Sequence, residues 1–280
     1  MTPLVSFVMP TYNRASSISG AIQSIRAQTE PDWELIVVDD ASSDNTAEVI
    51  KGMHDSRIRC IRQTSNHGPG AARNVGVAHA KARWVSYLDS DNELLPSYAE
   101  TMLGWLAKNP AAVFALPRSN RTEELWRNGV LIKTIDDSHD IPSDLTLKDI
   151  FMKKLNVDTN GFMHLRELFN DPAIRWDETL RHGMEDWDLA MLIGERYPKG
   201  FLYVPVVLYN YHQRYGGDGI VSNSTYQDWA DTLAYIYQKH KGDKLMHGQD
   251  WYPRKVEKWR RLQKEFEAGK LPPYYLYRFQ

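Results

Sequence analysis

Acidic residues end two apolar runs of the chain, in positions where they could bind a cation or polar groups. Asp89-Ser90-Asp91 and then Asn92 follow the run 84–88, and Asp39-Asp40 follows the run 35–38. Hard divalent cations such as Mg2+ and Mn2+ prefer oxygen ligands and bridge carboxylate and phosphate oxygens. Carboxylates also accept hydrogen bonds from the N–H and O–H groups of a base or ribose. On these residues alone, Asp91 or Asn92 could instead cap the following helix.

Glu185-Asp186 and His212 could add acid-base or metal chemistry. The two acids begin a predicted helix, and a carboxylate at that position could take a proton from a hydroxyl group. Acids in a first turn also interact favourably with the helix dipole, which explains them without chemistry. His212 follows the apolar run 201–208 and would complete a carboxylate metal site, but a single histidine is usually structural or on the surface.

The segment 67–74 contains a glycine-rich turn before a predicted helix. Gly68 and Gly70 fit the first two glycines of the dinucleotide-binding fingerprint, but Arg73 stands where the third belongs, and the turn follows the third strand. One interpretation is a helix start that presents N–H groups and a guanidinium to phosphate or base. A helix-capping loop with a solvated arginine explains the same residues.

Alternating strands and helices must position these side chains. Helices between strands predict a mainly parallel α/β sheet, and ligands bind beyond the carboxyl ends of such strands. Residues 10–14, Asp39-Asp40 and Asp89–Asn92 should therefore meet at one edge. The predicted strands are 4–9, 35–38, 58–61 and 84–88, and the predicted helices are 18–27, 46–53, 70–80 and 97–108.

The alternation fades after Pro117. We expect a hairpin or loop over 118–141, mixed elements to 215, a turn at Gly216–Gly219, and helices over 226–240 and 253–268. This organisation predicts a catalytic domain over 1–215, with a nucleotide-binding half (1–117) and an acceptor half (118–215), and a helical C-terminal extension over 216–280.

Composition limits the classes of protein. The 280 residues are 42% hydrophobic and 25% charged with a net charge of -2, which gives no general attraction to nucleic acid. The single cysteine, Cys60, is expected in the core of a strand and fits a reducing compartment. No signal sequence or run of about 18 apolar residues occurs, so a cytoplasmic protein is expected.

Together these motifs resemble family 2 glycosyltransferases of the GT-A fold, a Rossmann-like sheet flanked by helices. The resemblance covers about residues 4–215 and rests on five motifs in order. These are 8–14, 37–44, 66–74, 88–92 and Glu185-Asp186. Many family members have a further aspartate where this chain has Asn92.

The resemblance implies an enzyme that moves a sugar, a hexose or N-acetylhexosamine, from a nucleotide diphosphate to an acceptor hydroxyl with inversion. UDP is favoured by family frequency, the cofactor would be Mn2+ or Mg2+, and the role would be bacterial-type polysaccharide or glycoconjugate synthesis. Asp186 would be the catalytic base, and Asp91 and His212 would bind the metal. The donor side would comprise Pro10, Thr11, Tyr12, Arg14, Asp40, Arg73, Asp89 and Ser90. The acceptor side would comprise Asn160, His164 and Glu185, from the segment 156–164 and the helix that follows it.

The tail from residue 250 mixes aromatic with basic residues. It could touch an anionic membrane that bears a lipid-linked acceptor, or its aromatics could pack on the catalytic domain while its basic residues stay in water. Tyr274–Tyr277 could dock the terminus or form a dimer contact. Two other functions are a nucleotide-sugar-binding protein without transfer activity and a Rossmann-type dehydrogenase, which the missing first-strand glycines disfavour.

Overall fold

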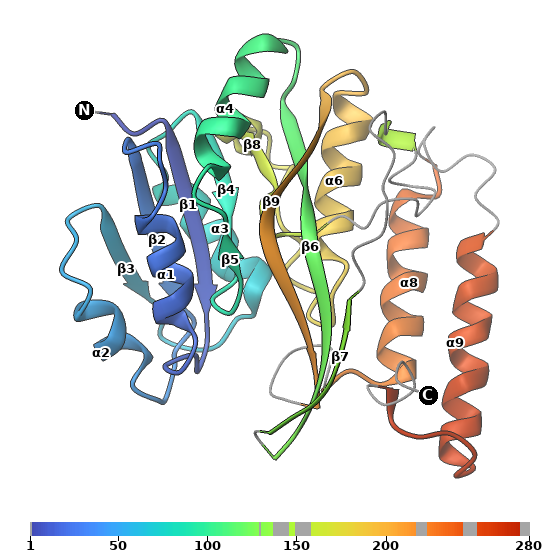
Figure 1. Cartoon of the computed structure of the whole chain (residues 1–280). Coiled ribbons are helices and arrows are strands. Elements are labelled where there is room, and N and C mark those ends of the chain that lie inside the picture. The colour runs from blue at the N-terminus through green and yellow to red at the C-terminus, as the bar shows by residue number, and fades with distance from the viewer. Residues whose placement is uncertain are drawn as a thin grey trace.

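The computed structural model describes residues 2–128, 130–136, 146–148, 158–216, 223–242 and 251–274. Within these residues, nine strands form one sheet in the order β3-β2-β1-β4-β8-β6-β9-β5, with β7 paired to β6 (Figure 1). The predicted α/β class with helices on the sheet is confirmed. The sheet is mixed, because antiparallel strands join its two parallel parts.

The first part of the chain forms the predicted parallel sheet. Strand β1 (Val5–Thr11) pairs with β2 (Trp33–Asp39) and β4 (Trp84–Tyr87), and β2 pairs with β3 (Ile58–Arg62). Every residue of β1, β2 and β4 is buried, as expected for strands covered on both faces. The helices between and after them are α1 (Ile18–Arg26), α2 (Thr46–Lys51), α3 (Pro69–His79) and α4 (Tyr98–Lys108).

Helices α3 and α4 cover opposite faces of the parallel sheet. Neighbouring residues of a strand point to opposite faces, and in β1 the Phe7 ring lies 6.1 Å from the Tyr98 ring of α4. Val8, on the other face, packs on α3 so closely that a Cβ at Gly76 would lie 2.3 Å from its Cγ1. A glycine is therefore required at position 76. Helix α3 starts close to the carboxyl ends of the strands.

The second half of the chain contributes longer strands. β6 (Phe114–Arg127) forms the expected hairpin with β7 (Val130–Asp136) and runs parallel to β9 (Phe201–Tyr215). The predicted boundary between halves, at residue 117, thus lies inside β6. Three short elements were not predicted: β5 (Glu93–Leu94), β8 (Met163–Leu165) and the 3-10 helix η1 (Arg166–Asn170).

The described residues of the acceptor half and the extension include the helices α6 (Glu185–Arg196), α8 (Tyr226–His240) and α9 (Trp251–Glu267). Helices α8 and α9 lie side by side (Figure 1). The rings of Tyr226 and Trp259 are 6.0 Å apart, and Tyr252 and Leu262 of α9 are buried. The aromatics of α9 thus pack on α8, within the predicted extension, whereas the sequence-based interpretation has them pack on the catalytic domain. No helix of the described residues has the length and apolar character needed to cross a membrane.

Cys60 corrects one expectation. Its side chain is exposed, because β3 is the end strand of the sheet among the described residues and its faces are only partly covered. Several predicted features fall outside the described residues: part of the 118–141 hairpin, Asn156 and Val157, Gly217–Gly219, and Tyr275–Tyr277.

Candidate active site

A cavity of about 1020 Å3 lies at the carboxyl ends of β1, β2 and β4. It extends from the β1 loop past the start of α6 to α8 and α9. All donor-side residues named from the sequence line it: Pro10, Thr11, Tyr12, Arg14, Asp40, Arg73, Asp89 and Ser90. Asp91, Glu185, Asp186 and His212 line it as well. The fold therefore brings together residues separated by as many as 200 positions.

The loop after β1 is held by the loop after β2. The backbone N–H of Asn13 donates to Ser42 Oγ at 2.9 Å, and that of Arg14 donates to Thr46 Oγ1 at 2.9 Å. Asn13 has a φ of 53°, a left-handed conformation that asparagine tolerates better than most residues. These contacts place Arg14 so that its Nε lies 3.9 Å from Asp91 Oδ2.

Asp40 fixes the turn that begins α3. Its two carboxylate oxygens accept the backbone N–H groups of His67 at 2.9 Å and Gly68 at 2.7 Å, and Gln63 donates to it at 2.6 Å. Gly68 has a φ of 91°, which suits a residue without a Cβ. Asp39 is fully buried, accepts the Ser42 N–H and does not line the cavity. Asp40 is thus the member of this pair that faces the cavity.

Asp89 and Asn92 form hydrogen bonds with residues outside the helix that follows them. The backbone N–H of Asp89 donates to Asn160 Oδ1 at 2.7 Å, and Asn160 Nδ2 donates back to Asp89 Oδ2 at 3.1 Å. Asn92 Oδ1 accepts the backbone N–H of His212 at 2.8 Å. The residue before α4 is Ser97, so the helix-cap alternative for Asp91 and Asn92 is wrong.

Arg73 joins the strand edge to the start of α6. Its guanidinium donates to Asp89 Oδ1 at 2.9 Å and to Glu185 Oε1 at 2.8 Å, and only 3% of its side chain is exposed. Burial lowers the pKa of Arg73, but the charges of Asp89 and Glu185 outweigh this and hold the pKa above its ordinary value. Arg73 is therefore not solvated as the capping-loop interpretation predicts, although Gly68 of that loop is the N-cap residue of α3.

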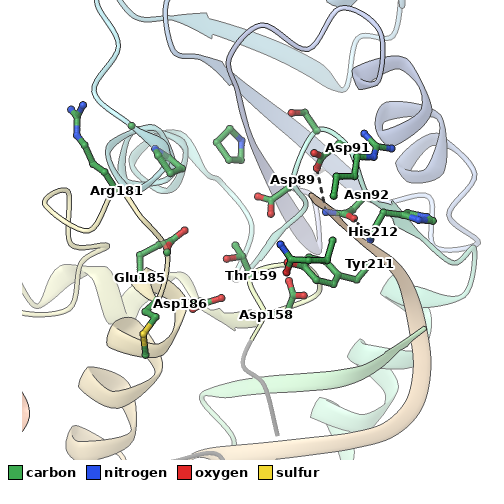
Figure 2. Close-up of a pocket in the computed structure, with 18 of the residues that line it drawn as sticks. Asp89, Asp91, Asn92, Asp158, Thr159, Arg181, Glu185, Asp186, Tyr211 and His212 are labelled. Carbon is green, nitrogen blue, oxygen red and sulfur yellow. Dashed lines mark hydrogen bonds between the residues drawn. The ribbon is translucent and has the colours of Figure 1, made fainter. Parts of the chain in front are cut away.

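Asp186 lies across the cavity from Asp89 and Asp91, beside Glu185 (Figure 2). Burial, followed by the negative charges of Glu185 and Asp158, raises the pKa of Asp186 well above its ordinary value. A carboxylate with a raised pKa is a stronger base than an exposed one, which suits proton abstraction near neutral pH. The raised pKa therefore suits Asp186 to accept a proton.

Asp158 is a cavity residue that the sequence analysis did not single out. It accepts hydrogen bonds from the backbone and side-chain nitrogens of Asn160, both at 2.8 Å. Burial raises the pKa of Asp158 to about 7. Its carboxyl interacts electrostatically with both Asp186 and Asp89, and Figure 2 shows all three residues in the cavity. Its position just ahead of the predicted acceptor residues Asn160 and His164 was the signal that could have found it.

The acceptor-side prediction needs one correction. His164 is fully buried in the core and does not line the cavity. Its ring stacks on Phe169 at 5.0 Å and bonds to Tyr87 Oη at 2.7 Å, and burial lowers its pKa to about 4. Strand β8 turns this side chain into the sheet packing. Asn160 is also fully buried but supports Asp89 and Asp158, and Glu185 reaches the cavity.

The possible metal ligands around Asp89 and Asp91 suit a divalent cation only in part. Among the described residues, no three His, Cys, Asp or Glu side chains form a group that could hold a metal. The Nδ1 of His212 lies 3.0 Å from Glu124 Oε1, and its ring points away from Asp91 in Figure 2. The predicted pair of Asp91 and His212 is thus not assembled in this structure. Mg2+ commonly uses one or two carboxylates plus substrate phosphates, and the Asp89-Ser90-Asp91 segment fits that arrangement.

Comparisons with known proteins agree with this site. A family model described as Glycosyl transferase family 2 matches residues 6–170. The chain is 30% identical over 224 residues to the succinoglycan biosynthesis protein ExoO of Rhizobium meliloti, covering 76% of this chain and 62% of that protein. It is 39% identical over 106 residues to the Escherichia coli protein WfgD, a UDP-Glc:alpha-D-GlcNAc-diphosphoundecaprenol beta-1,3-glucosyltransferase, covering 38% of this chain and 42% of WfgD. The chain therefore spans less than two thirds of these relatives.

A solved structure shares the fold. The crystal structure of residues 1–349 of TarS from S. aureus, in complex with UDP-GlcNAc, matches with a TM-score of 0.69. The match covers 94% of this chain and 72% of that one at 18% sequence identity.

Proposed function

We propose that this chain, which belongs to glycosyltransferase family 2, transfers a sugar from a UDP-sugar to an acceptor hydroxyl with inversion, in the synthesis of a bacterial polysaccharide or glycoconjugate. The family match sets aside the dehydrogenase alternative. The observation that carries the proposal is the placement of Asp186, with its raised pKa, across one cavity from Asp89 and Asp91. The printed names of WfgD and ExoO support a UDP-sugar donor and a polysaccharide product.

The mechanism is one in-line displacement. The acceptor oxygen forms a bond to the anomeric carbon while the bond from that carbon to the diphosphate breaks, and the electron pair leaves with the diphosphate. Asp186 accepts the proton of the acceptor hydroxyl. Holding both substrates in one cavity replaces a bimolecular encounter with an oriented one.

The donor would lie along the strand edge. Arg14, the β1 loop and Asp40 line the same cavity, and they would contact the nucleotide. A divalent cation bound at Asp91 would offset charge on the departing diphosphate. Asp89 is fixed by Arg73 and Asn160, so its oxygens are oriented before a donor arrives.

A screen of nucleotide sugars tests the proposal. We expect UDP or one UDP-sugar to raise the melting temperature with Mn2+ or Mg2+, because a ligand that binds the folded state stabilises it. The native chain should release UDP from that donor when an acceptor is present.

The variant Asp186→Asn separates transfer from binding. It should keep the thermal shift and lose turnover by about 100-fold or more, the usual range for a general base. A native chain that binds the donor but never transfers would favour the alternative of an inactive nucleotide-sugar-binding protein. Near-normal turnover in Asp186→Asn would remove Asp186 from the mechanism.

A further inference from the structure

One wall of the cavity comes from the C-terminal helices and contains none of the predicted donor-side residues. Trp229 and Leu233 lie on α8, Lys255, Lys258 and Trp259 lie on α9, and Tyr274 follows α9. We call these six residues the C-terminal wall. The same cavity holds Asp89 and Asp186, so a ligand on this wall shares space with the reacting groups.

The wall presents a cluster of aromatic rings. The ring of Tyr274 lies 5.6 Å from that of Trp229 and 5.4 Å from that of Trp259. Trp229 and Trp259 are half-buried and line the cavity, so the apolar face of a sugar ring could lie on them.

The same wall is positively charged. Lys255 and Lys258 add two cations to it, and no carboxylate of the described residues forms an ion pair with Lys258. The carboxyl groups of Asp89, Asp91 and Asp158 also line the cavity, but Arg73, Arg14 and Arg121 lie near them. Lys258 therefore offers the anionic group of a ligand a cation that no carboxylate of the described residues neutralises.

The wall adjoins the residues that lead to Asp186. Trp229 lies against Gly183, where a Cβ would come 3.1 Å from the Trp229 Cη2 atom. Gly183 has a φ of 103° and stands three residues before Asp186. A ligand on Trp229 therefore lies next to the loop that begins α6. In the proposed mechanism the acceptor gives its proton to Asp186. A ligand in this position would therefore be the acceptor.

We infer that the C-terminal wall is the acceptor site, and that the acceptor carries an anionic group, a phosphate or a carboxylate, beside the sugar ring that rests on the indoles. The inference depends on the proposed transferase activity and names the chemical class of its second substrate. The extension is then part of the active site.

Three octyl-linked probes test the charge of the acceptor on the full chain: a glycosyl diphosphate, a glucuronide and a neutral glucoside. The rate of UDP release from the donor is measured against probe concentration. We expect a KM at least about 10-fold lower for one charged probe than for the glucoside, equivalent to one charge-assisted contact. The diphosphate and the glucuronide distinguish a phosphate from a carboxylate. Equal KM values for all three probes would overturn the inference.

Variants test the residues. Lys258→Gln should raise the KM of the better charged probe about 10-fold, and Trp259→Ala, which removes the ring, should raise the KM of every probe. Lys264→Gln, exposed on the same helix and outside the cavity, is the matched control. An unchanged KM in Lys258→Gln would contradict the inference. Failure of the transferase proposal looks different, because UDP would then cause no thermal shift and no probe would promote UDP release.

Discussion

Lys239 of α8 donates a hydrogen bond to Asp188 of α6 at 2.8 Å. The other carboxylate oxygen of Asp188 is bonded to the His240 ring at 2.8 Å, and Asp188 is fully buried. Since Asp188 stands two residues after Asp186, this contact fixes the helix of the proposed base to the C-terminal extension. The extension therefore positions the catalytic helix as well as forming a wall of the cavity.

Removal of the Asp188 carboxylate should destabilise the protein strongly. Asp188→Ala removes the buried carboxylate that Lys239 and His240 share, while Lys239 keeps its ion pair with Asp177. Removing one partner of a buried ion pair costs about 3–5 kcal/mol, and the remaining pair with Asp177 should bring the loss to the lower end of this range. Urea denaturation gives the free energy of unfolding. The control Asp171→Ala removes the exposed ion pair with Arg196 at the other end of α6, where a loss of at most about 1 kcal/mol is expected. Equal losses in the two variants would contradict the assigned role.

Arg73→Lys should lower activity although it keeps the positive charge. A lysine cannot place two fixed N–H groups on Asp89 and Glu185 together. Losing one hydrogen bond to a charged group costs about 1.5–3 kcal/mol, so kcat/KM should fall about 10- to 100-fold. Arg57→Lys, which alters a surface pair with Asp55 outside the cavity, is the control. A change of less than about twofold in Arg73→Lys would show that this link does not support catalysis.

Activity should rise with pH as Asp186 loses its proton. Burial and the charges of Glu185 and Asp158 raise the pKa of Asp186, so its basic form appears at a higher pH than for an ordinary aspartate. The kcat/KM profile of the native chain should show an acidic limb. In Asp158→Asn one of the raising charges is gone, and the limb should move to lower pH. A limb that stays in place would mean that Asp158 does not influence the base.

Asp158 should also make stability depend on pH. Its folded-state pKa of about 7 is above the unfolded value, so the folded state binds more protons and stability falls as pH rises from about 4 to 7. The substitution Asp158→Asn removes this pH-dependent contribution to the free energy of unfolding. The variant should therefore gain stability relative to the native chain by about 2–4 kcal/mol between pH 4 and pH 8, since one pKa unit is about 1.4 kcal/mol. A pH-independent difference would contradict the raised pKa.

Asp91→Asn should weaken metal-dependent binding of UDP. The substitution keeps the shape but removes the negative charge, so the Mn2+ concentration for half-maximal UDP binding should rise about 10-fold or more. Titration calorimetry of UDP at several Mn2+ concentrations gives this value. Asp231→Asn, exposed on α8, is the control.

His212→Ala shows whether the histidine ring turns from Glu124 to a metal when UDP is bound. We expect a rise in the same Mn2+ concentration that is smaller than in Asp91→Asn. No rise would leave His212 a partner of Glu124 alone.

Binding to an anionic membrane surface should be electrostatic. The apolar side of α9 is already used by packing on α8, and its exposed residues include Arg254, Lys258, Arg260, Arg261 and Lys264. Flotation with anionic liposomes should succeed at low salt and fail near 0.5 M NaCl, since the Debye length is only about 10 Å at 0.1 M.

The double variant Arg260→Glu/Arg261→Glu tests the basic face without removing α9. It should abolish flotation, and neutral liposomes serve as the control. Equal flotation of the native chain and this variant would contradict a membrane role for α9.

Local sequence was enough to place the strand ends and their acids. The buried runs of β1, β2 and β4 show up as apolar stretches because both faces of these strands are covered. Asp40, Asp89 and Asp91 follow them directly and must meet at the carboxyl edge of a parallel sheet. Asp186 was found because it opens a helix within a recognisable motif.

Only the tertiary structure decided which side chains reach the cavity. Arg73 and Glu185 form a hydrogen bond although they are 112 positions apart in the sequence. The three-residue strand β8 directs His164 into the core. Burial, which the sequence does not show, raises the pKa of Asp158. Nothing in the sequence indicated that α8 and α9 form part of the cavity wall. Helical periodicity shows which face of a helix is apolar, whereas packing between segments distant in sequence determines what that face meets.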